Sequence, residues 1–412
     1  MRQRLLSLSL AGLLLLQGVS SVLADTSTAT TKPKKIGAQQ RMDENLPPFP
    51  KPDPETAFAE LKVLDEQGRF YRIPQEDWAG GRLRTEQDPA WADWLEQKRQ
   101  KLDAWIAERQ DHVEWPCGYA HQYVHPKTGA YLPYSPDVPG EFIHVPGQEP
   151  VAVNDDIRAA WVNRFRKDHM AQILEAARMY RLTQEERYRD WAIGQMDFYA
   201  DNFDDFIPYS GSPVRVGQLF GNQLNDATMT VVLAQAARLL WDDISPEKRT
   251  SWGEKLFYPV VRLQQEQPFS CPHNISCWQL SMIGLVAMLY DDPDLWEYAM
   301  AGQRGISIQL TRGVTSDYIW FEQSMGYNLY VAEALTPFFR EAALQGRMED
   351  IRHEAAIYEN LLLSPLQLRF PNGMLPNLSD VTGRTTVSTL RRRLADVADF
   401  VPTYAGLEYA SR

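Results

Sequence analysis

The chain has 412 residues, of which 44% are hydrophobic and 23% charged, an ordinary composition for a globular protein and unlike that of a disordered one. Its formal net charge of -12 argues against a nucleic-acid partner, because phosphate binding depends on clustered Lys and Arg. An acidic ligand stays possible, since a local group of cations inside a cleft is enough to hold it.

The start of the chain predicts a secretory signal peptide. A basic beginning is followed by an apolar run over residues 5–16 and by small residues that end at Ala24. We therefore expect cleavage after Ala24 and a periplasmic or secreted protein. Residues 25–55 are rich in Thr, Lys, Pro and Gln and predict a flexible leader, and residues 56–412 are expected to form one domain. No later stretch has the roughly 20 apolar residues of a membrane-spanning helix.

The first predicted helix begins at Asp88-Pro89, a capping residue followed by proline at the first helical position. Its apolar side chains, including Trp91, Trp94 and Trp105, recur on one helical face, which predicts a face packed in the core. Residues 115–150 are dense in Pro, Gly, Tyr and His without a helical period. They predict a long ordered loop or a small β excursion.

From residue 154 onward the sequence predicts helical hairpins with short turns. A Thr183-x-x-Glu186 capping box separates the helices of the first pair. Such hairpins build either a solenoid, which needs a recognisable repeat, or a toroid, which does not. No repeated motif is found, so the expected fold is an all-α toroid. The expected helices cover residues 157–180 and 186–201, 222–241 and 246–264, 274–290 and 293–309, and 321–344 followed by a helix ending near 363.

The first stretch with chemical potential is Cys271-Pro272-His273-Asn274, which precedes an apolar helix that contains Trp278. Polar groups there would lie at a helix N-terminus, where unpaired N–H groups and the helix dipole favour an anion such as a uronate carboxylate. The alternative is that Asn274 is simply the N-cap and His273 a surface residue.

Two further stretches carry polar and aromatic side chains. Glu322, Tyr327, Asn328 and Tyr330 would form a cleft wall, because Tyr327 and Tyr330 project from nearly the same helical face. Taken alone, a tyrosine pair at this spacing is more often half-buried packing than a catalytic site. A turn-rich loop, Phe370 to Asp380, is either a binding loop or a plain connector.

The sequence predicts no metal or organic cofactor. Neither a Cys-x-x-Cys nor a His-Glu-x-x-His motif occurs. The three cysteines, Cys117, Cys271 and Cys277, allow one disulfide and leave one thiol over.

In their order along residues 115–385, these stretches resemble the heparinase II/III-like polysaccharide lyases, a group that includes oligo-alginate lyases. The matching segments are a loop at residues 123–129, the helix start at Asn274, residues 313–330, and an Asn-Gly-x-Leu-Pro-x-x-x-Asp loop at residues 372–380. Two positions depart from the pattern, with His125 in place of the usual Cys and Tyr318 in place of Gly. The resemblance implies an incomplete (α/α) toroid of helical hairpins, here without the β-sandwich module usual in the family.

The resemblance also implies a reaction, β-elimination at a uronic acid, with an acidic polysaccharide or oligosaccharide as the binding partner. Asn274, assisted by His273, would neutralise the charge that develops on the carboxyl group, and Tyr327 would act as general acid or base. No cofactor is implied. The residues expected to contact substrate are Tyr330, Glu322, Asn328, Trp278 and Asp380.

Two other functions fit the same sequence. A glycoside hydrolase on a helical toroid would need two opposed acids, for which Asp226, Glu322 and Asp380 are candidates. A non-catalytic polysaccharide-binding toroid is suggested by the 12 Trp and 18 Tyr. The sequence does not identify the polysaccharide, the mode of cleavage or the oligomeric state.

Overall fold

The computed structural model describes residues 48–411 apart from 210–216, 270, 377 and 380–384. The chain divides into two compact units, Met1–Gly37 and Ala38–Arg412, and only the second contains described residues. The predicted signal peptide and residues 25–47 of the predicted leader lie outside the described part.

The described residues are mainly helical, and the sequence accounts for most of the helix starts through local capping side chains. The only strands among them are β1 (Phe142–Ile143) and β2 (Val151–Ala152), an antiparallel pair inside the predicted irregular segment. Short 3₁₀ turns lie at Ala59–Leu61, Ala120–Gln122, Phe203–Asp205, Trp241–Asp243 and Ser364–Leu366, and a π-helical turn at Gly253–Phe257. The α-helices are α1 (Trp78–Gln87), α2 (Pro89–Glu108), α3 (Asp155–Thr183), α4 (Glu186–Asp201), α5 (Gln223–Leu240), α6 (Pro246–Trp252), α7 (Tyr258–Glu266), α8 (Asn274–Tyr290), α9 (Pro293–Met300), α10 (Ile306–Gly313), α11 (Met325–Leu344), α12 (Arg352–Leu363), α13 (Val387–Asp396) and α14 (Tyr404–Ala410).

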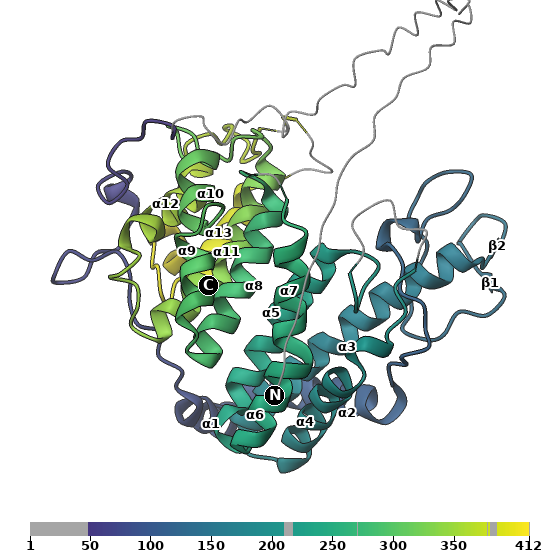
Figure 1. The fold of residues 1–412 in the computed structure, drawn as a ribbon. Coiled ribbons are helices and arrows are strands. Elements are labelled where there is room, and N and C mark those ends of the chain that lie inside the picture. Colours follow the sequence, from purple (N-terminus) through teal and green to yellow (C-terminus); the bar gives the residue numbers. More distant parts are fainter. Residues whose placement is uncertain (1–47, 210–216, 270, 377, 380–384, 412) are drawn as a thin grey trace, which may run out of the picture. The chain divides into compact units, whose positions relative to one another are not determined.

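The helices pack as consecutive hairpins. The first helices of successive hairpins, α3, α5, α8 and α11, each pack against the next in the series. The returning helices α4, α7, α9 and α12 pack against the first helix of their own hairpin (Figure 1). The predicted fold class, an all-α incomplete toroid of helical hairpins, is confirmed.

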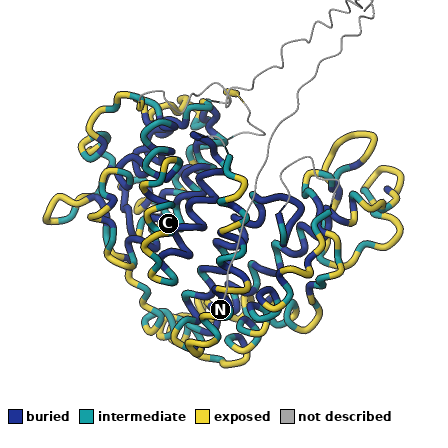
Figure 2. The backbone as a smooth tube through the Cα atoms, viewed as in Figure 1, coloured by how far each residue is buried: buried dark blue, intermediate teal, exposed yellow. Residues whose placement is uncertain are grey.

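The series α3, α5, α8 and α11 also contains much of the core (Figure 2). Helix α8 is buried from Ser276 to Met288 without interruption, as expected for a helix that is apolar all round. Gly284 permits a close approach between α8 and α11, because a Cβ there would lie 2.5 Å from the ring of Phe338. Burial around the whole circumference therefore fixes α8 between its neighbours.

Several predicted helix boundaries are wrong, among them the start of α11, which lies four residues after the predicted residue 321. The expected helix over residues 293–309 is broken between Met300 and Ile306. The predicted capping box also fails, because Thr183 is the last residue of α3 and its hydroxyl donates to the carbonyl of Met179 (2.8 Å). The same hydroxyl accepts from the backbone N–H of Glu185, so Thr183 serves the turn between α3 and α4.

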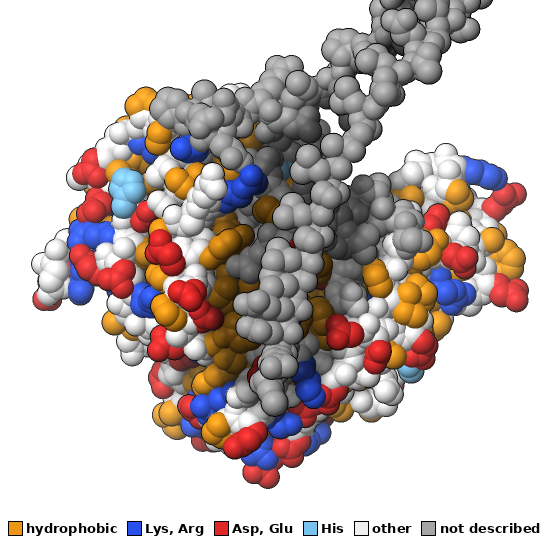
Figure 3. Space-filling model, viewed as in Figure 1, with side chains coloured by type: hydrophobic (Ala, Val, Ile, Leu, Met, Phe, Trp, Pro, Cys, Tyr) orange, Lys and Arg blue, Asp and Glu red, His pale blue; other side chains and the backbone are white. Residues whose placement is uncertain are grey.

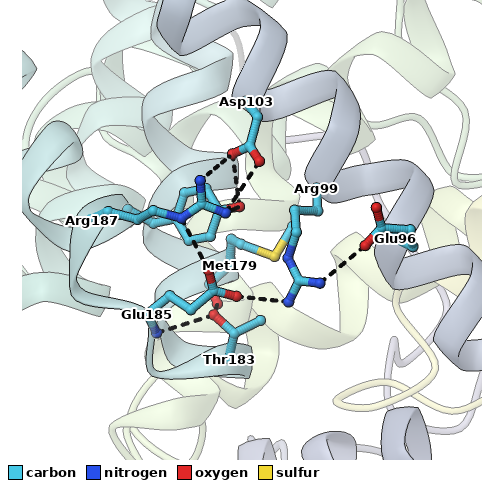
Figure 4. A network of polar contacts seen from close by, with 8 residues as sticks. Glu96, Arg99, Asp103, Met179, Thr183, Glu185 and Arg187 are labelled. Atoms are coloured by element: carbon cyan, nitrogen blue, oxygen red, sulfur yellow. Dashed lines mark hydrogen bonds and ion pairs between the residues drawn. The ribbon is translucent and has the colours of Figure 1, made fainter.

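Ion pairs and hydrogen bonds between charged side chains connect α2 to the turn between α3 and α4 and to the first turn of α4 (Figure 4). On α2, Arg99 donates to Glu185 (2.7 Å) and also pairs with Glu96 (3.1 Å). Asp103 accepts from Arg187 (3.1 Å). Because several such pairs share partners, the network fixes how α2 lies on the first hairpin, although each exposed pair contributes little alone.

Part of the predicted leader is folded. Lys51 Nζ donates to a backbone carbonyl of α10 (2.7 Å), and the carbonyl of Pro52 accepts from the hydroxyl of Tyr318 (2.6 Å). Glu55 forms an ion pair with Arg352 at the start of α12 (2.7 Å). Fixed structure therefore begins before residue 56. None of the described helices is both long and apolar enough to cross a membrane.

Candidate active site

At the N-terminus of α8, the capping residue is His273 and not Asn274, the residue that the alternative interpretation of the sequence expected as the cap. His273 is the N-cap, and its Nδ1 accepts the backbone N–H of Ile275 (3.0 Å). The backbone N–H of His273 itself donates to Gln309 Oε1 (2.9 Å). Because His273 caps the helix, the amide side chain of Asn274 is not consumed by capping. His273 is buried and positions the helix start, so it is not a surface residue.

Asn274 is instead oriented by a carboxylate from the loop that precedes α11. Its Nδ2 donates to Glu322 Oε2 (2.9 Å), and the indole N–H of Trp320 donates to the same oxygen (2.7 Å). Both donors come from buried residues, so the position of Glu322 is well determined. The predicted substrate contact Glu322 therefore acts on Asn274 directly, and holds its amide at the end of α8.

The predicted tyrosine pair lies in the first two turns of α11. Ser324 caps this helix by accepting the backbone N–H of Tyr327 (3.2 Å). The rings of Tyr327 and Tyr330 are 6.4 Å apart, and Tyr330 lies 5.6 Å from the ring of Trp278 on α8. Burial, and to a lesser degree the charge of Glu333, raises the pKa of Tyr330. Tyr330 therefore keeps its proton at neutral pH, which suits a donor and not a base.

Two other predicted polar residues belong to the core. Asn328 has no exposed surface: its Oδ1 accepts from the backbone N–H of Trp320 (2.8 Å), and its Nδ2 donates to the carbonyl of Leu361 (2.9 Å). Asn328 thus shapes the loop carrying Glu322 and is too deeply buried to contact substrate. Asp226 is also fully buried, and its carboxylate accepts backbone N–H groups of residues 218 and 220 (2.6 and 2.9 Å). Because Asp226 has no exposed surface and binds backbone N–H groups, it is not placed to protonate a substrate as the acid of a hydrolase.

A central cavity of about 730 Å³ is lined by Trp278, the neighbour of Tyr330, but by neither tyrosine of the pair and not by Asn274 or Glu322. We define the central cavity by its lining from α3, α5, α8, α11, α12 and α13, which includes Trp278 and Leu329 next to the site. Glu333 and Arg393 line it and form an ion pair with each other (2.9 Å). Hydrophobic side chains gather in a hollow on the face of Figure 3 where α5 and α8 lie in Figure 1. The cavity therefore offers apolar walls with a few polar groups, the usual character of a ligand site.

Sequence reasoning missed an aromatic and basic cluster in the segment before α3. His121 Nδ1 lies 2.7 Å from the hydroxyl of Tyr131, and its ring lies 4.8 Å from that of Tyr119. Partial burial and the charges of Lys167 and Arg164 lower the pKa of His121. Tyr119 in turn is near enough to Tyr330 to contribute to its raised pKa. The irregular spacing of these residues gave no pattern from which their approach to α11 could be inferred.

The remaining predictions concern metals, thiols and the last loop. Within the described residues, no group of three or more His, Cys, Asp or Glu side chains could hold a metal ion. All three cysteines are buried and unbridged, so the disulfide that the sequence allowed is not formed. Burial raises the pKa of Cys117 to about 11, which makes it unreactive. The predicted substrate contact Asp380 lies outside the described residues.

Comparison with known proteins gives similarity to lyases in sequence and in structure. No family model matches the chain. An alginate lyase of Stenotrophomonas maltophilia (strain K279a) is 25% identical over 210 residues, which cover 49% of this chain and 28% of that protein. The matched region thus spans less than a third of that relative.

Two solved structures are also similar at 13% sequence identity. Heparinase III matches with a TM-score of 0.44, covering 81% of this chain and 53% of that one. Alginate lyase A1-III from Sphingomonas species A1 matches with a TM-score of 0.42, covering 85% and 98%. The sequence match to an alginate lyase agrees with the resemblance to the heparinase II/III-like polysaccharide lyases, a group that includes oligo-alginate lyases.

Proposed function

We propose that this protein is a polysaccharide lyase that cleaves a uronic-acid-containing polysaccharide or oligosaccharide by β-elimination. The observation that carries the proposal is the amide of Asn274, which is not used in helix capping and is held by Glu322 at the start of α8, the helix whose Trp278 lies against Tyr330 of α11. The sequence similarity to an alginate lyase supports the same reaction class. The predicted signal peptide supports action in the periplasm or outside the cell.

The first requirement of the reaction is to stabilise negative charge. The proton at C5 of a uronic acid is weakly acidic, and its removal sends charge onto the neighbouring carboxyl group. Asn274 supplies an oriented N–H donor at the positive end of the α8 dipole, where an anion is favoured. Because Glu322 fixes the amide before substrate arrives, little reorganisation is needed during the reaction.

The second requirement is proton transfer. We assign the removal of the C5 proton, or protonation of the departing glycosidic oxygen, to Tyr327, a role that typically contributes roughly 10²- to 10⁴-fold in rate. An ordinary tyrosine pKa of about 10 must fall for the base role, and cations or hydrogen-bond donors directed at the phenol oxygen would lower it. Tyr330, which keeps its proton, serves as hydrogen-bond donor or second proton-transfer group.

The proposal is tested by incubating the purified protein with a panel of uronate polysaccharides and oligosaccharides. Each β-elimination creates a C4=C5 double bond that absorbs in the ultraviolet, whereas hydrolysis creates none. We expect a rising absorbance with at least one substrate and its loss in Tyr327→Phe. A flat trace across the panel for a folded wild-type protein would refute a lyase.

A second variant tests the role given to Glu322. Charge-assisted hydrogen bonds contribute about 1.5–3 kcal/mol, so Glu322→Gln should lower kcat by about 10- to 150-fold with little change in KM. Glu254→Gln, an exposed residue on the π-helical turn, is the matched control and should leave kcat unchanged. Equal kcat values for Glu322→Gln and wild type would show that the amide of Asn274 needs no orientation.

A further inference from the structure

A second cavity lies at the C-terminal ends of the first helices of the hairpins, α3, α5 and α11. We define this distal pocket, of about 600 Å³, by its lining from α1, α2 and the C-terminal halves of α3, α5 and α11. It includes Arg340 of α11, thirteen positions beyond Tyr327, which corresponds to about 20 Å along the helix. The distal pocket is therefore separate from the proposed catalytic site.

The distal pocket has two solvent-exposed tryptophans in its wall. Trp91 and Trp94 of α2 are 43% and 42% exposed, and their rings lie 5.6 Å apart. The sequence predicted that both pack in the core with Trp105, which is only partly exposed and packs on Phe165. Exposed pairs of large aromatic side chains beside a cavity usually mark a binding surface. The face of α2 that binds the first hairpin is fixed independently by the network of Figure 4.

The pocket has as many arginines as carboxylates in its lining, and one of the arginines is left for an acidic ligand. Arg340 pairs with Asp399 outside the pocket. Arg238 is neutralised inside it by Glu76 (2.7 Å) and Glu341 (3.0 Å), and the side chain of Asp77 caps α1. Arg84, by contrast, is exposed and has no ion-pair or hydrogen-bond partner for its side chain in the described part of the chain. An uncompensated guanidinium beside two exposed rings suits a ligand that carries a carboxylate and an apolar face.

The distal pocket is continuous with the central cavity. The two share Arg178, Gln235, Pro337 and Asp396 in their linings. Arg178 forms an ion pair with Glu175 (2.7 Å). The carboxylate of Asp396 can accept hydrogen bonds from hydroxyl groups. A ligand in the distal pocket therefore meets a cation on the side of α1 and an acceptor on the side of the central cavity.

We propose that the distal pocket is a second binding site for an acidic saccharide. Sugar rings stack on Trp91 and Trp94, a uronate carboxylate pairs with Arg84, and hydroxyl groups donate to Asp396. The choice of a uronate saccharide rests on the proposed function, while the site itself rests on the exposed rings, the uncompensated arginine and the shared lining.

The test uses the full chain carrying Tyr327→Phe, with tryptophan replaced by fluorotryptophan, and fluorine NMR during titration with alginate-derived oligosaccharides of one length. Signals of Trp91 and Trp94 are assigned from single Trp→Phe variants. We expect both signals to shift with ligand, and the double variant Trp91→Ala/Trp94→Ala to raise by roughly tenfold or more the Kd of that binding event measured by calorimetry. Tyr404→Ala removes an exposed aromatic ring outside both cavities and should bind like the parent.

Arg84→Gln isolates the charge. It should weaken binding of the acidic oligosaccharides and leave unchanged any binding of uncharged cello-oligosaccharides of the same length. Unshifted Trp91 and Trp94 signals at saturating ligand would overturn the distal site, even if the ultraviolet assay shows lyase activity. Shifted signals and a weakened double variant would establish the site, even if that assay stays flat and the proposed function fails.

Discussion

A buried ion pair between Asp111 and Arg166 should contribute strongly to the stability of the first hairpin. Both side chains are fully buried, with Arg166 Nε 2.7 Å from Asp111 Oδ2. Arg166 also donates to the carbonyls of Leu219 (2.5 Å) and His112 (3.2 Å), and Tyr199 donates to Asp111 (2.7 Å). The guanidinium of α3 thus binds the segment before β1 and the loop before α5, and its partner Asp111 binds helix α4.

Arg166→Met keeps most of the side-chain volume and removes the charge and its hydrogen bonds. Breaking one side of a buried ion pair costs about 3–5 kcal/mol, because the partner is left charged without compensation. With an unfolding entropy of about 2.1 cal/mol/K per residue, a domain of this size should lose about 4–7 °C in Tm. We therefore expect a large loss at neutral pH that no surface substitution would produce.

The pH dependence of the loss gives an independent check. Burial alone raises the pKa of Asp111, but the charge and hydrogen bonds of Arg166 outweigh it and lower the pKa below its ordinary value. In the wild type this stabilisation is present above the unfolded-state pKa of about 3.9 and is lost as the pH falls through the folded pKa. In Arg166→Met the uncompensated Asp111 becomes protonated more easily. The difference between the proteins should therefore shrink as the pH falls toward 4.

Urea unfolding at pH 7 and at lower pH measures both effects, with Arg166→Met/Asp111→Leu completing a double-mutant cycle. The double variant should lose less free energy of unfolding than the two single losses added together, because no unpaired charge remains. A loss below about 1 kcal/mol for Arg166→Met at pH 7 would refute the assigned role, since ordinary surface substitutions reach about half that value.

Two further predictions concern the core. Burial raises the pKa of Asp226 to about 7. The stability that Asp226 contributes should therefore be complete below its unfolded-state pKa and disappear as the pH rises from about 4 to about 7. Urea unfolding should show this fall of the unfolding free energy with pH in the wild type and not in Asp226→Asn, and an equal fall in both proteins would contradict the assignment. Gly284→Ala should cost about 1–3 kcal/mol because its Cβ meets a phenylalanine ring of α11, whereas Gly194→Ala, on open helical surface, should gain about 0.5–1 kcal/mol. Thermal unfolding compares the two, and a gain for both would mean that α8 and α11 are less tightly packed.

Local chemistry explains why most helix starts were predictable. Asp88, Asn154, Asn222, Ser245 and Asp292 each cap the helix that the sequence predicted after them. A cap is formed by a side chain and backbone N–H groups two or three residues away, so sequence alone contains the whole interaction. The predicted apolar run of residues 274–290 became α8 for a similar reason, since its composition demands burial whatever covers it.

The candidate site depended more on contacts between distant residues. Sequence identified Asn274 and Glu322, but their hydrogen bond joins residues 48 positions apart and redefines both roles. Asn328 has the same polar side chain as Asn274, yet it is sealed in the core because Trp320 and Leu361 present backbone groups to it. Sequence pattern gives residue type and periodicity and contains no information on which long-range partner will satisfy a given amide.

The amphipathic pattern of α2 likewise did not show which of its tryptophans would be buried. By sequence alone the apolar face of this helix runs from Trp91 to Trp105, and periodicity treats both ends alike. In the fold, Trp105 packs against α3 while Trp91 and Trp94 are left beside an open pocket. The sequence by itself determined that the chain forms helical hairpins and which polar stretches begin α8 and α11. Only the packing of α2 on the first hairpin decided which of its tryptophans are exposed to solvent. A side chain on the apolar face of α2 is buried where a neighbouring helix covers it, and the helical period of the sequence does not show how far that neighbour extends.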